Sequence, residues 1–141
     1  MSTFFTDKKI TKVAAAATSA GTAVNGTGLS MEGFENVIFM AAFGTANAGN
    51  YLKAQGSADN STWADIKDSK ATPGADGDLV ALELYETSAN HAYVRPVGIR
   101  AGANTTLGDI IAIQTRSKVK PTTQPTGTVA KTVYYTPEGT P

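Results

Sequence analysis

The chain has 141 residues, 12 acidic and 12 basic side chains, and no cysteine. A chain of this length folds as one domain with a core of its own. The zero net charge argues against nucleic acid or an anionic membrane as a partner, and the lack of cysteine excludes disulfides and thiolate metal sites. We also expect no membrane helix and no signal peptide, because no apolar segment is long enough for either.

The charges are unevenly distributed along the chain. Residues 57–88 carry seven acids and two lysines, whereas residues 116–141 carry four bases and one acid. Such segments are either separately solvated or form complementary surfaces in an assembly, and the sequence leaves both interpretations open.

The N-terminal residues 1–12 are polar except for the pair Phe4-Phe5, and we interpret them as an arm whose aromatic side chains need a place to be buried. Residues 12–23 are rich in alanine, which favours helix, but are flanked by Val, Thr and Gly, which favour strand. We predict a strand there.

Residues 51–66 are typical of a β-hairpin. A mixed apolar and polar segment is followed by the turn formers of residues 56–61 and then by a second segment with Trp63, the only tryptophan. We predict that Trp63 anchors the hairpin in the core, so that Trp63→Ala would cost about 3–5 kcal/mol.

Three further segments have strand patterns. Residues 34–43 are apolar on both faces, which predicts a central strand covered on both sides, and Leu79 to Tyr85 alternates between apolar and mixed positions. Residues 91–101 contain Pro96, which cannot donate to a ladder and therefore predicts an edge or a bulge. Residues 107–115 are the last strong strand.

This spacing of short strands and turns predicts an all-β fold, a single antiparallel β-sandwich of jelly-roll-like form with extended N- and C-terminal arms. We place the N-terminal arm at residues 1–12, the sandwich at 13–116 and the C-terminal arm at 117–141.

The C-terminal arm is rich in proline and threonine and is predicted to attach to a partner rather than to complete the fold. Deleting it would then leave the thermal transition nearly unchanged. The candidate partner-binding residues combine the aromatic pair of the N-terminus with the bases and the apolar cluster of the C-terminal arm: Phe4, Phe5, Lys118, Lys120, Lys131, Val133, Tyr134 and Tyr135.

No catalytic, cofactor-binding or metal-binding residue is assigned, and we expect no enzyme activity. His91 is the only histidine and no nucleophile-elbow sequence accompanies it. The carboxylates of Asp76, Asp78 and Asp59 do not follow the EF-hand pattern. Arg95 and Arg100 are five residues apart in one strand, so they face opposite sides and do not form a phosphate clamp.

Five stretches carry a resemblance to a known family: Val24-Asn25-Gly26-Thr27-Gly28, MEGFENVIFMAAFGT, QGSADNSTWADI, LVALELYETSANHAYVRPVGIRAG and LGDIIAIQT. In this order they resemble small phage and prophage head decoration proteins, also called capsid-cement proteins. The resemblance spans Val24 to Lys120, and AYVRPVGIR and DIIAIQ are its most specific parts.

The resemblance implies a non-enzymatic β-sandwich on the capsid exterior of the virion, made in the host cytoplasm and without cofactors. Its partners would be the major capsid protein and further copies of itself, with a trimer as one candidate form, and neither nucleic acid nor membrane. Two alternatives remain: a head-completion or tail component, and a carbohydrate-binding β-sandwich module in which Trp63 and Tyr85 would stack on sugars.

Overall fold

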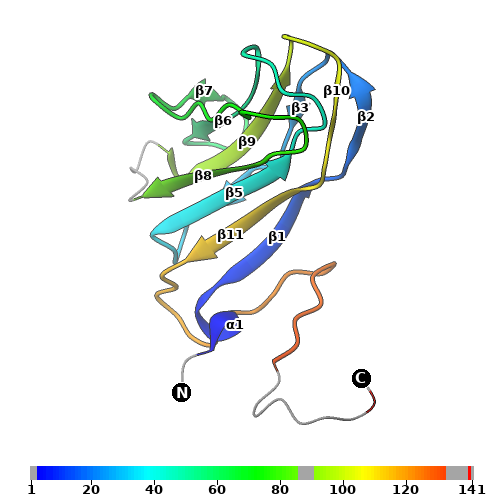
Figure 1. Ribbon diagram of the computed structural model, residues 1–141. Coiled ribbons are helices and arrows are strands. Elements are labelled where there is room, and N and C mark those ends of the chain that lie inside the picture. Colours follow the sequence, from blue (N-terminus) through cyan, green and yellow to red (C-terminus); the bar gives the residue numbers. More distant parts are fainter. Residues whose placement is uncertain (1–2, 86–90, 133–139, 141) are drawn as a thin grey trace.

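The computed structural model describes residues 3–85, 91–132 and 140, and it is almost entirely β (Figure 1). Within these residues there are one short helix and eleven strands: α1 (Phe4–Asp7), β1 (Lys9–Ala14), β2 (Ala17–Ala20), β3 (Val24–Asn25), β4 (Leu29–Ser30), β5 (Asn36–Ala42), β6 (Asn50–Ser57), β7 (Ala64–Asp65), β8 (Leu79–Tyr85), β9 (Tyr93–Arg100), β10 (Thr105–Leu107) and β11 (Ile110–Thr115).

The strands form two main antiparallel sheets. Sheet A has the order β1-β11-β5-β8, and sheet C has the order β3-β9-β6-β7, with β4 also paired to β9. A two-stranded ribbon, β10-β2, joins the sheets at one end. The predicted antiparallel β-sandwich is therefore confirmed.

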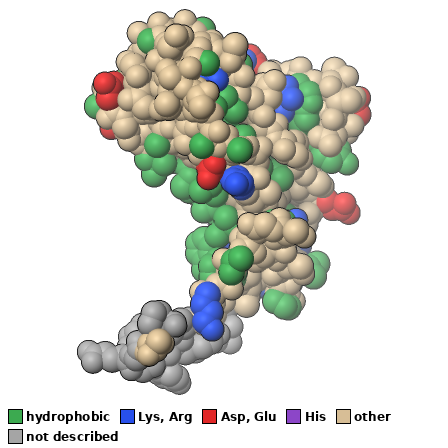
Figure 2. All heavy atoms as spheres, turned by 90° about the vertical axis from the view of Figure 1, so that its right-hand side faces the viewer, with side chains coloured by type: hydrophobic (Ala, Val, Ile, Leu, Met, Phe, Trp, Pro, Cys, Tyr) green, Lys and Arg blue, Asp and Glu red, His purple; other side chains and the backbone are tan. Residues whose placement is uncertain are grey.

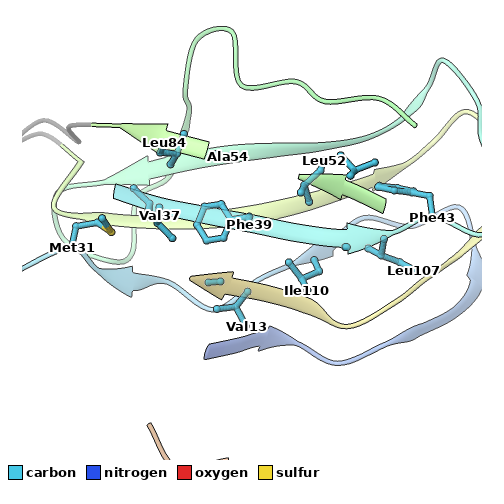
Figure 3. Packing of buried hydrophobic residues seen from close by; sticks show 14 residues of the cluster. Val13, Met31, Val37, Phe39, Phe43, Leu52, Ala54, Leu84, Leu107 and Ile110 are labelled. Carbon is cyan, nitrogen blue, oxygen red and sulfur yellow. The ribbon is translucent and has the colours of Figure 1, made fainter. Parts of the chain in front are cut away.

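The core lies between the inward faces of sheets A and C (Figure 3). Val37, Phe39 and Ala41 of β5 point into it and are at most 2% exposed. They belong to one cluster with Leu52 and Ala54 of β6, which are fully buried. Because side chains alternate along a strand, the burial of these residues determines which side chains of both sheets face outward.

Arg100, at the end of β9, fastens the ribbon to sheet C. Its side chain is only 4% exposed, and it forms no ion pair with any other residue in the described part of the chain. Instead the guanidinium donates to the backbone oxygens of Thr18, Thr22 and Thr105 at 2.6–2.9 Å. Arg95 is on the outer face of the same strand, as the spacing of the two arginines predicts.

The predicted edge or bulge at Pro96 is wrong. β9 is a central strand, and its register with β6 is unbroken from Asn50 to Ser57. The Pro96 carbonyl accepts a hydrogen bond from the Gly26 nitrogen at 2.8 Å. The N–H and C=O of one residue in an antiparallel strand point to the same side, so the missing donor faces the turn between β3 and β4 and costs the β6 ladder nothing.

The other strand predictions hold with shifted limits. The 51–66 hairpin is present as β6 and β7, and β8 alternates as predicted. The single strand predicted over 107–115 is divided into β10 and β11, and the strand predicted over 12–23 is divided into β1 and β2. β1 begins at Lys9, so it includes the last residues of the segment interpreted as the N-terminal arm.

The turn of the hairpin is organised by Asp59. Its carboxylate accepts hydrogen bonds from the backbone nitrogens of Thr62 and Ser61 at 2.8 and 2.9 Å and from the Ser57 hydroxyl at 2.9 Å. These bonds, those from Thr62 and Ser61 above all, hold the pKa of Asp59 well below its usual value. Asn60, next to it, has a φ of 60°, a left-handed conformation that asparagine tolerates.

We expect Arg100→Ala to reduce the free energy of unfolding by about 2–4 kcal/mol, because the buried Thr105 carbonyl and the more accessible carbonyls of Thr18 and Thr22 all lose a charged donor. Urea unfolding followed by tryptophan fluorescence or circular dichroism measures this loss. Arg95→Ala, on the solvent side of the same strand, is the matched control and should cost about 1 kcal/mol. Equal losses for the two variants would show that Arg100 does not hold the ribbon.

Candidate interaction surfaces

The outer face of sheet A is largely apolar, with one charged side chain on each of its two edge strands. The registers place outward side chains in two rows, which run from β1 through β11 and β5 to β8. The first row is Ile10, Ile113, Ile38 and Glu83, and the second is Lys12, Ile111, Met40 and Ala81. Ala42 and Leu79 continue the apolar surface at one end, and Tyr85 lies at the other. We call this surface the A face.

The A face is not covered by other described residues. Ile38, Met40, Ile111 and Ile113 are partly exposed, although they lie in the two central strands. On β8, Leu79 is 65% exposed. Sheet A lies nearest the viewer in Figure 1, and Figure 2 shows hydrophobic side chains along the margin that this sheet forms in the turned view.

This surface corrects the prediction for residues 34–43. The segment is a central strand of its sheet, as expected, but only one of its faces is covered by the protein. The apolar character of both faces was a signal in the sequence, and in the structure it corresponds to a core on one side and a partly exposed apolar surface on the other. Contiguous exposed apolar patches of several hundred Å² mark interaction sites on soluble proteins.

Charge is confined to the rim of the A face. Lys12 lies on the edge strand β1 and Glu83 on the opposite edge strand β8, and both side chains are exposed. Neither residue forms an ion pair within the part of the chain that the structure describes. The face therefore has an apolar centre, a positive edge and a negative edge.

The second surface is built by the two arms, which the structure brings together below the sandwich (Figure 1). The Thr122 nitrogen donates to the Thr6 oxygen at 2.9 Å. Gln124 accepts from the Ile10 nitrogen at 2.8 Å and donates to the Lys8 oxygen at 2.6 Å. The Thr128 hydroxyl donates to the Ile10 oxygen at 2.7 Å. The arm thus satisfies backbone groups along the outer edge of β1.

The predicted partner-binding residues are distributed over these arms. Phe4 is 45% exposed and Phe5 is partly buried, and their rings meet edge to face with centroids 5.5 Å apart. Lys118, Lys120 and Lys131 are exposed. The remaining predicted residues lie outside the described part of the chain: Val133, Tyr134 and Tyr135.

Lys120 connects the arms electrostatically. Its ammonium lies 3.2 Å from one oxygen of Asp7, and the Lys8 ammonium lies 3.0 Å from the other. Hydrogen bonds from Lys8 and then Lys120 lower the pKa of Asp7. Lys120 is thus engaged within the chain, whereas Lys118 and Lys131 form no ion pair with another described residue.

The outer face of sheet C differs from the A face because polar side chains pair with one another on it. The Arg95 guanidinium donates to the Gln55 side-chain oxygen at 2.7 and 2.9 Å, and Gln55 donates to Asp65 at 2.9 Å. Lys53 lies 2.8 Å from Asp65, and with Gln55 it lowers the pKa of that carboxyl. This network satisfies its own members within the described part of the chain.

Trp63 belongs to this outer face, so the prediction that it anchors the core is wrong. Its ring is partly exposed and lies outside the core cluster, with the Arg95 guanidinium 4.5 Å from the ring centroid. The position of Gly28 explains the placement, because a Cβ there would lie 2.8 Å from the tryptophan ring. Trp63 directly precedes β7, which is the edge strand of sheet C.

No metal-binding cluster emerges among the described residues. They contain no group of three or more His, Asp or Glu side chains that could hold a metal ion. Asp76 accepts from the Ala46 nitrogen, and Asp78 accepts from the Gly74 and Ala75 nitrogens, so both carboxylates shape the loop before β8. His91 is partly buried beside Gly56, where a Cβ would lie 2.4 Å from the imidazole.

No family model matches this chain, and no curated protein matches it. Among solved structures it is similar to the Clostridium thermocellum N-terminal endo-1,4-β-D-xylanase 10B, CBM22-1–GH10 modules complexed with xylohexaose. The identity is 12%, the TM-score is 0.39, and the match covers 72% of this chain and 19% of that chain. A likeness of this size carries no conclusion about what the present chain binds.

None of the described helical residues forms a segment long and apolar enough to cross a membrane.

The position of Trp63 changes the expected cost of its removal. We expect Trp63→Ala to reduce the free energy of unfolding by about 1–2 kcal/mol, because the ring is partly exposed and contributes chiefly its contact with Arg95. Phe39→Ala, in the centre of the core, should cost about 3–5 kcal/mol under the same denaturant titration. A Trp63→Ala loss as large as that of Phe39→Ala would restore the core interpretation.

The contacts of the C-terminal arm with β1 change the expectation that the arm contributes almost nothing to stability. Gln124→Ala should free the arm from β1, so that trypsin cleaves after Lys118 and Lys131 faster than in the unaltered protein, whereas Pro121 protects the bond after Lys120. Deleting residues 117–141 should cost about 1–3 kcal/mol, because the Ile10 backbone groups lose both partners.

Thr126→Ala is the matched control, since Thr126 is exposed and has no side-chain hydrogen bond to another described residue. Digestion of Gln124→Ala at the rate of this control would mean that the arm is held by other contacts.

Proposed function

We propose that the protein is a non-enzymatic structural component of a phage particle, a decoration protein that binds the outer surface of an icosahedral head and stabilises it. The observation that carries a role in assembly is the A face, an apolar surface over four strands that no described residue of the chain covers. The resemblance of residues 24–120 to head decoration proteins supplies the head as the assembly.

Two kinds of surface support this role. The A face is suited to a close protein contact, because it has an apolar centre and a charged rim, the usual composition of a protein interface. The joined arms present Phe4 and the bases Lys118 and Lys131, which form no ion pair with another described residue and suit an acidic and partly apolar capsid surface. A molecule with both surfaces can hold more than one neighbour at once.

Multivalent contact is the mechanism we assign to stabilisation. When one copy touches several subunits, local loosening of the shell must break several contacts together, and each remaining contact keeps the others at high effective concentration. The sandwich is well suited to this task because its own core is complete between sheets A and C. Binding at the A face and the arms therefore requires no rearrangement of the domain.

A carbohydrate-binding module is the alternative. Its candidate rings, Trp63 and Tyr85, both lie at outer surfaces, but each is contacted by a guanidinium of the same chain, from Arg95 at 4.5 Å and Arg116 at 5.5 Å. Sugar stacking at either ring would compete with these contacts or use the opposite ring face. The apolar A face also contains no aromatic ring in its two central strands, where a stacking platform would be expected.

The test uses heads from the phage or prophage that encodes the chain, prepared from a deletion strain. The purified full chain is added and sedimented with the heads. We expect saturation at a fixed ratio to the capsid protein and a raised temperature of head disruption. Lys118→Glu with Lys131→Glu should weaken binding about tenfold, because two favourable charge contacts become repulsive.

Lys67→Glu is the matched control, an exposed charge reversal in the loop that follows β7, and it should bind normally. Absence of co-sedimentation would overturn the proposal. Binding to a glycan panel, lost in Trp63→Ala or Tyr85→Ala, would favour the carbohydrate-binding alternative instead.

A further inference from the structure

We propose that the A face pairs with the A face of a second copy of this chain, with the strands of the two copies aligned and β1 of each copy lying over β8 of the other. The inference rests on the proposed function, since it names the partner of the same surface. It leaves the joined arms of both copies available for the capsid.

The charged edges favour a second copy as the occupant. A two-fold interface is self-complementary, so each feature of the surface must meet its complement on an identical surface. The A face meets this condition because its positive residue, Lys12, and its negative residue, Glu83, lie on opposite edge strands. An apolar band of isoleucine and methionine side chains separates them and would pack against its own copy.

The same charges select the orientation of the pair. A two-fold axis parallel to the strands places β1 over β8, so Lys12 approaches Glu83 of the second copy twice, once at each edge. A two-fold axis that runs across the strands places β1 over β1 and brings like charges together. In this arrangement Lys12 of one copy and Glu83 of the other are offset by two positions, about 7 Å along the strand. Their extended side chains can bridge this offset, and the usual angle of about 30° between packed sheets can reduce it.

The size of the A face suits a dimer of moderate affinity. Four strands spaced by about 4.8 Å, with six or seven residues rising about 3.4 Å each, cover roughly 450 Å² in projection. Two such faces bury about 1,000 Å² in total, close to the lower limit for specific interfaces. We therefore expect dissociation constants in the range of about 1–100 μM, with the dimer stabilised further when both copies bind one head.

Pairing of two A faces would also prevent nonspecific association. An exposed sheet face of Ile38, Met40, Ile111 and Ile113 promotes nonspecific association unless a defined partner covers it. Closed two-fold pairing uses the face completely and leaves no second face open to a third copy. The self-satisfied polar network on the outer face of sheet C then remains in contact with solvent.

Sedimentation velocity or light scattering of the full chain between about 1 and 200 μM is the first measurement. We expect a monomer–dimer equilibrium, and Met40→Glu should weaken it by at least about 100-fold, because the symmetric interface would bury two unpaired carboxylates. Ile99→Glu is the matched control: Ile99 is a partly exposed position of a central strand, but on the outer face of sheet C. It should dimerise normally.

Charge exchange tests the orientation and uses only exposed positions. Lys12→Glu and Glu83→Lys should each weaken the dimer about three- to tenfold, and the double variant should recover most of the loss because the pair is restored with reversed signs. A double variant weaker than either single variant would overturn the arrangement of β1 over β8.

The two proposals fail in different ways. A chain that is monomeric throughout the range, or that forms trimers or open-ended oligomers, would overturn the dimer, while saturable head binding would leave the decoration role intact. A dimer that responds to Met40→Glu but does not bind heads would support the pairing and overturn the decoration role.

Discussion

The packing of β5 against sheet C is the constraint on which the rest of the structure depends. β5 is the central strand between β11 and β8, and its inward side chains Val37, Phe39 and Ala41 leave almost no exposed surface. Because side chains alternate, a slip of one residue would turn this whole set outward, so core packing determines the register. The register in turn places Ile38 and Met40 on the outer surface beside the isoleucines of β11. The core and the A face are thus two consequences of one choice of register.

The two edge strands of sheet A, β1 and β8, are protected from pairing in different ways. Open strand edges present unpaired backbone groups and invite association, so proteins cover them or break them up. At β1 the C-terminal arm covers the edge, where the side chains of Gln124 and Thr128 take the backbone groups of Ile10. An arm that in sequence looks like a free attachment device therefore has a structural role near its origin. At β8 the charge of Glu83 lies on the edge strand and discourages nonspecific strand pairing.

The two outer faces of the sandwich differ in how far their side chains are satisfied within the chain. On sheet C, Arg95, Gln55 and Asp65 bind one another and remain solvated at little cost, because every charged group has a partner. On sheet A the outward side chains between the charged edges are apolar, and no described residue covers them. Exposing the A face to water therefore costs more free energy than exposing the outer face of sheet C.

Local patterns in the sequence determined the all-β class, the 51–66 hairpin, the alternation of β8 and the opposite directions of Arg95 and Arg100, because each depends on residues that are neighbours along the strand. Only the tertiary structure decided which side of β5 is covered, where Trp63 lies, how Pro96 fits a central strand and that the arms meet. Each of these depends on a pairing between distant segments: the ladder of β9 with β6, the turn at Gly26 opposite Pro96, and Gln124 against β1. Periodicity records whether a side chain is apolar, but which surface covers it is decided by long-range packing.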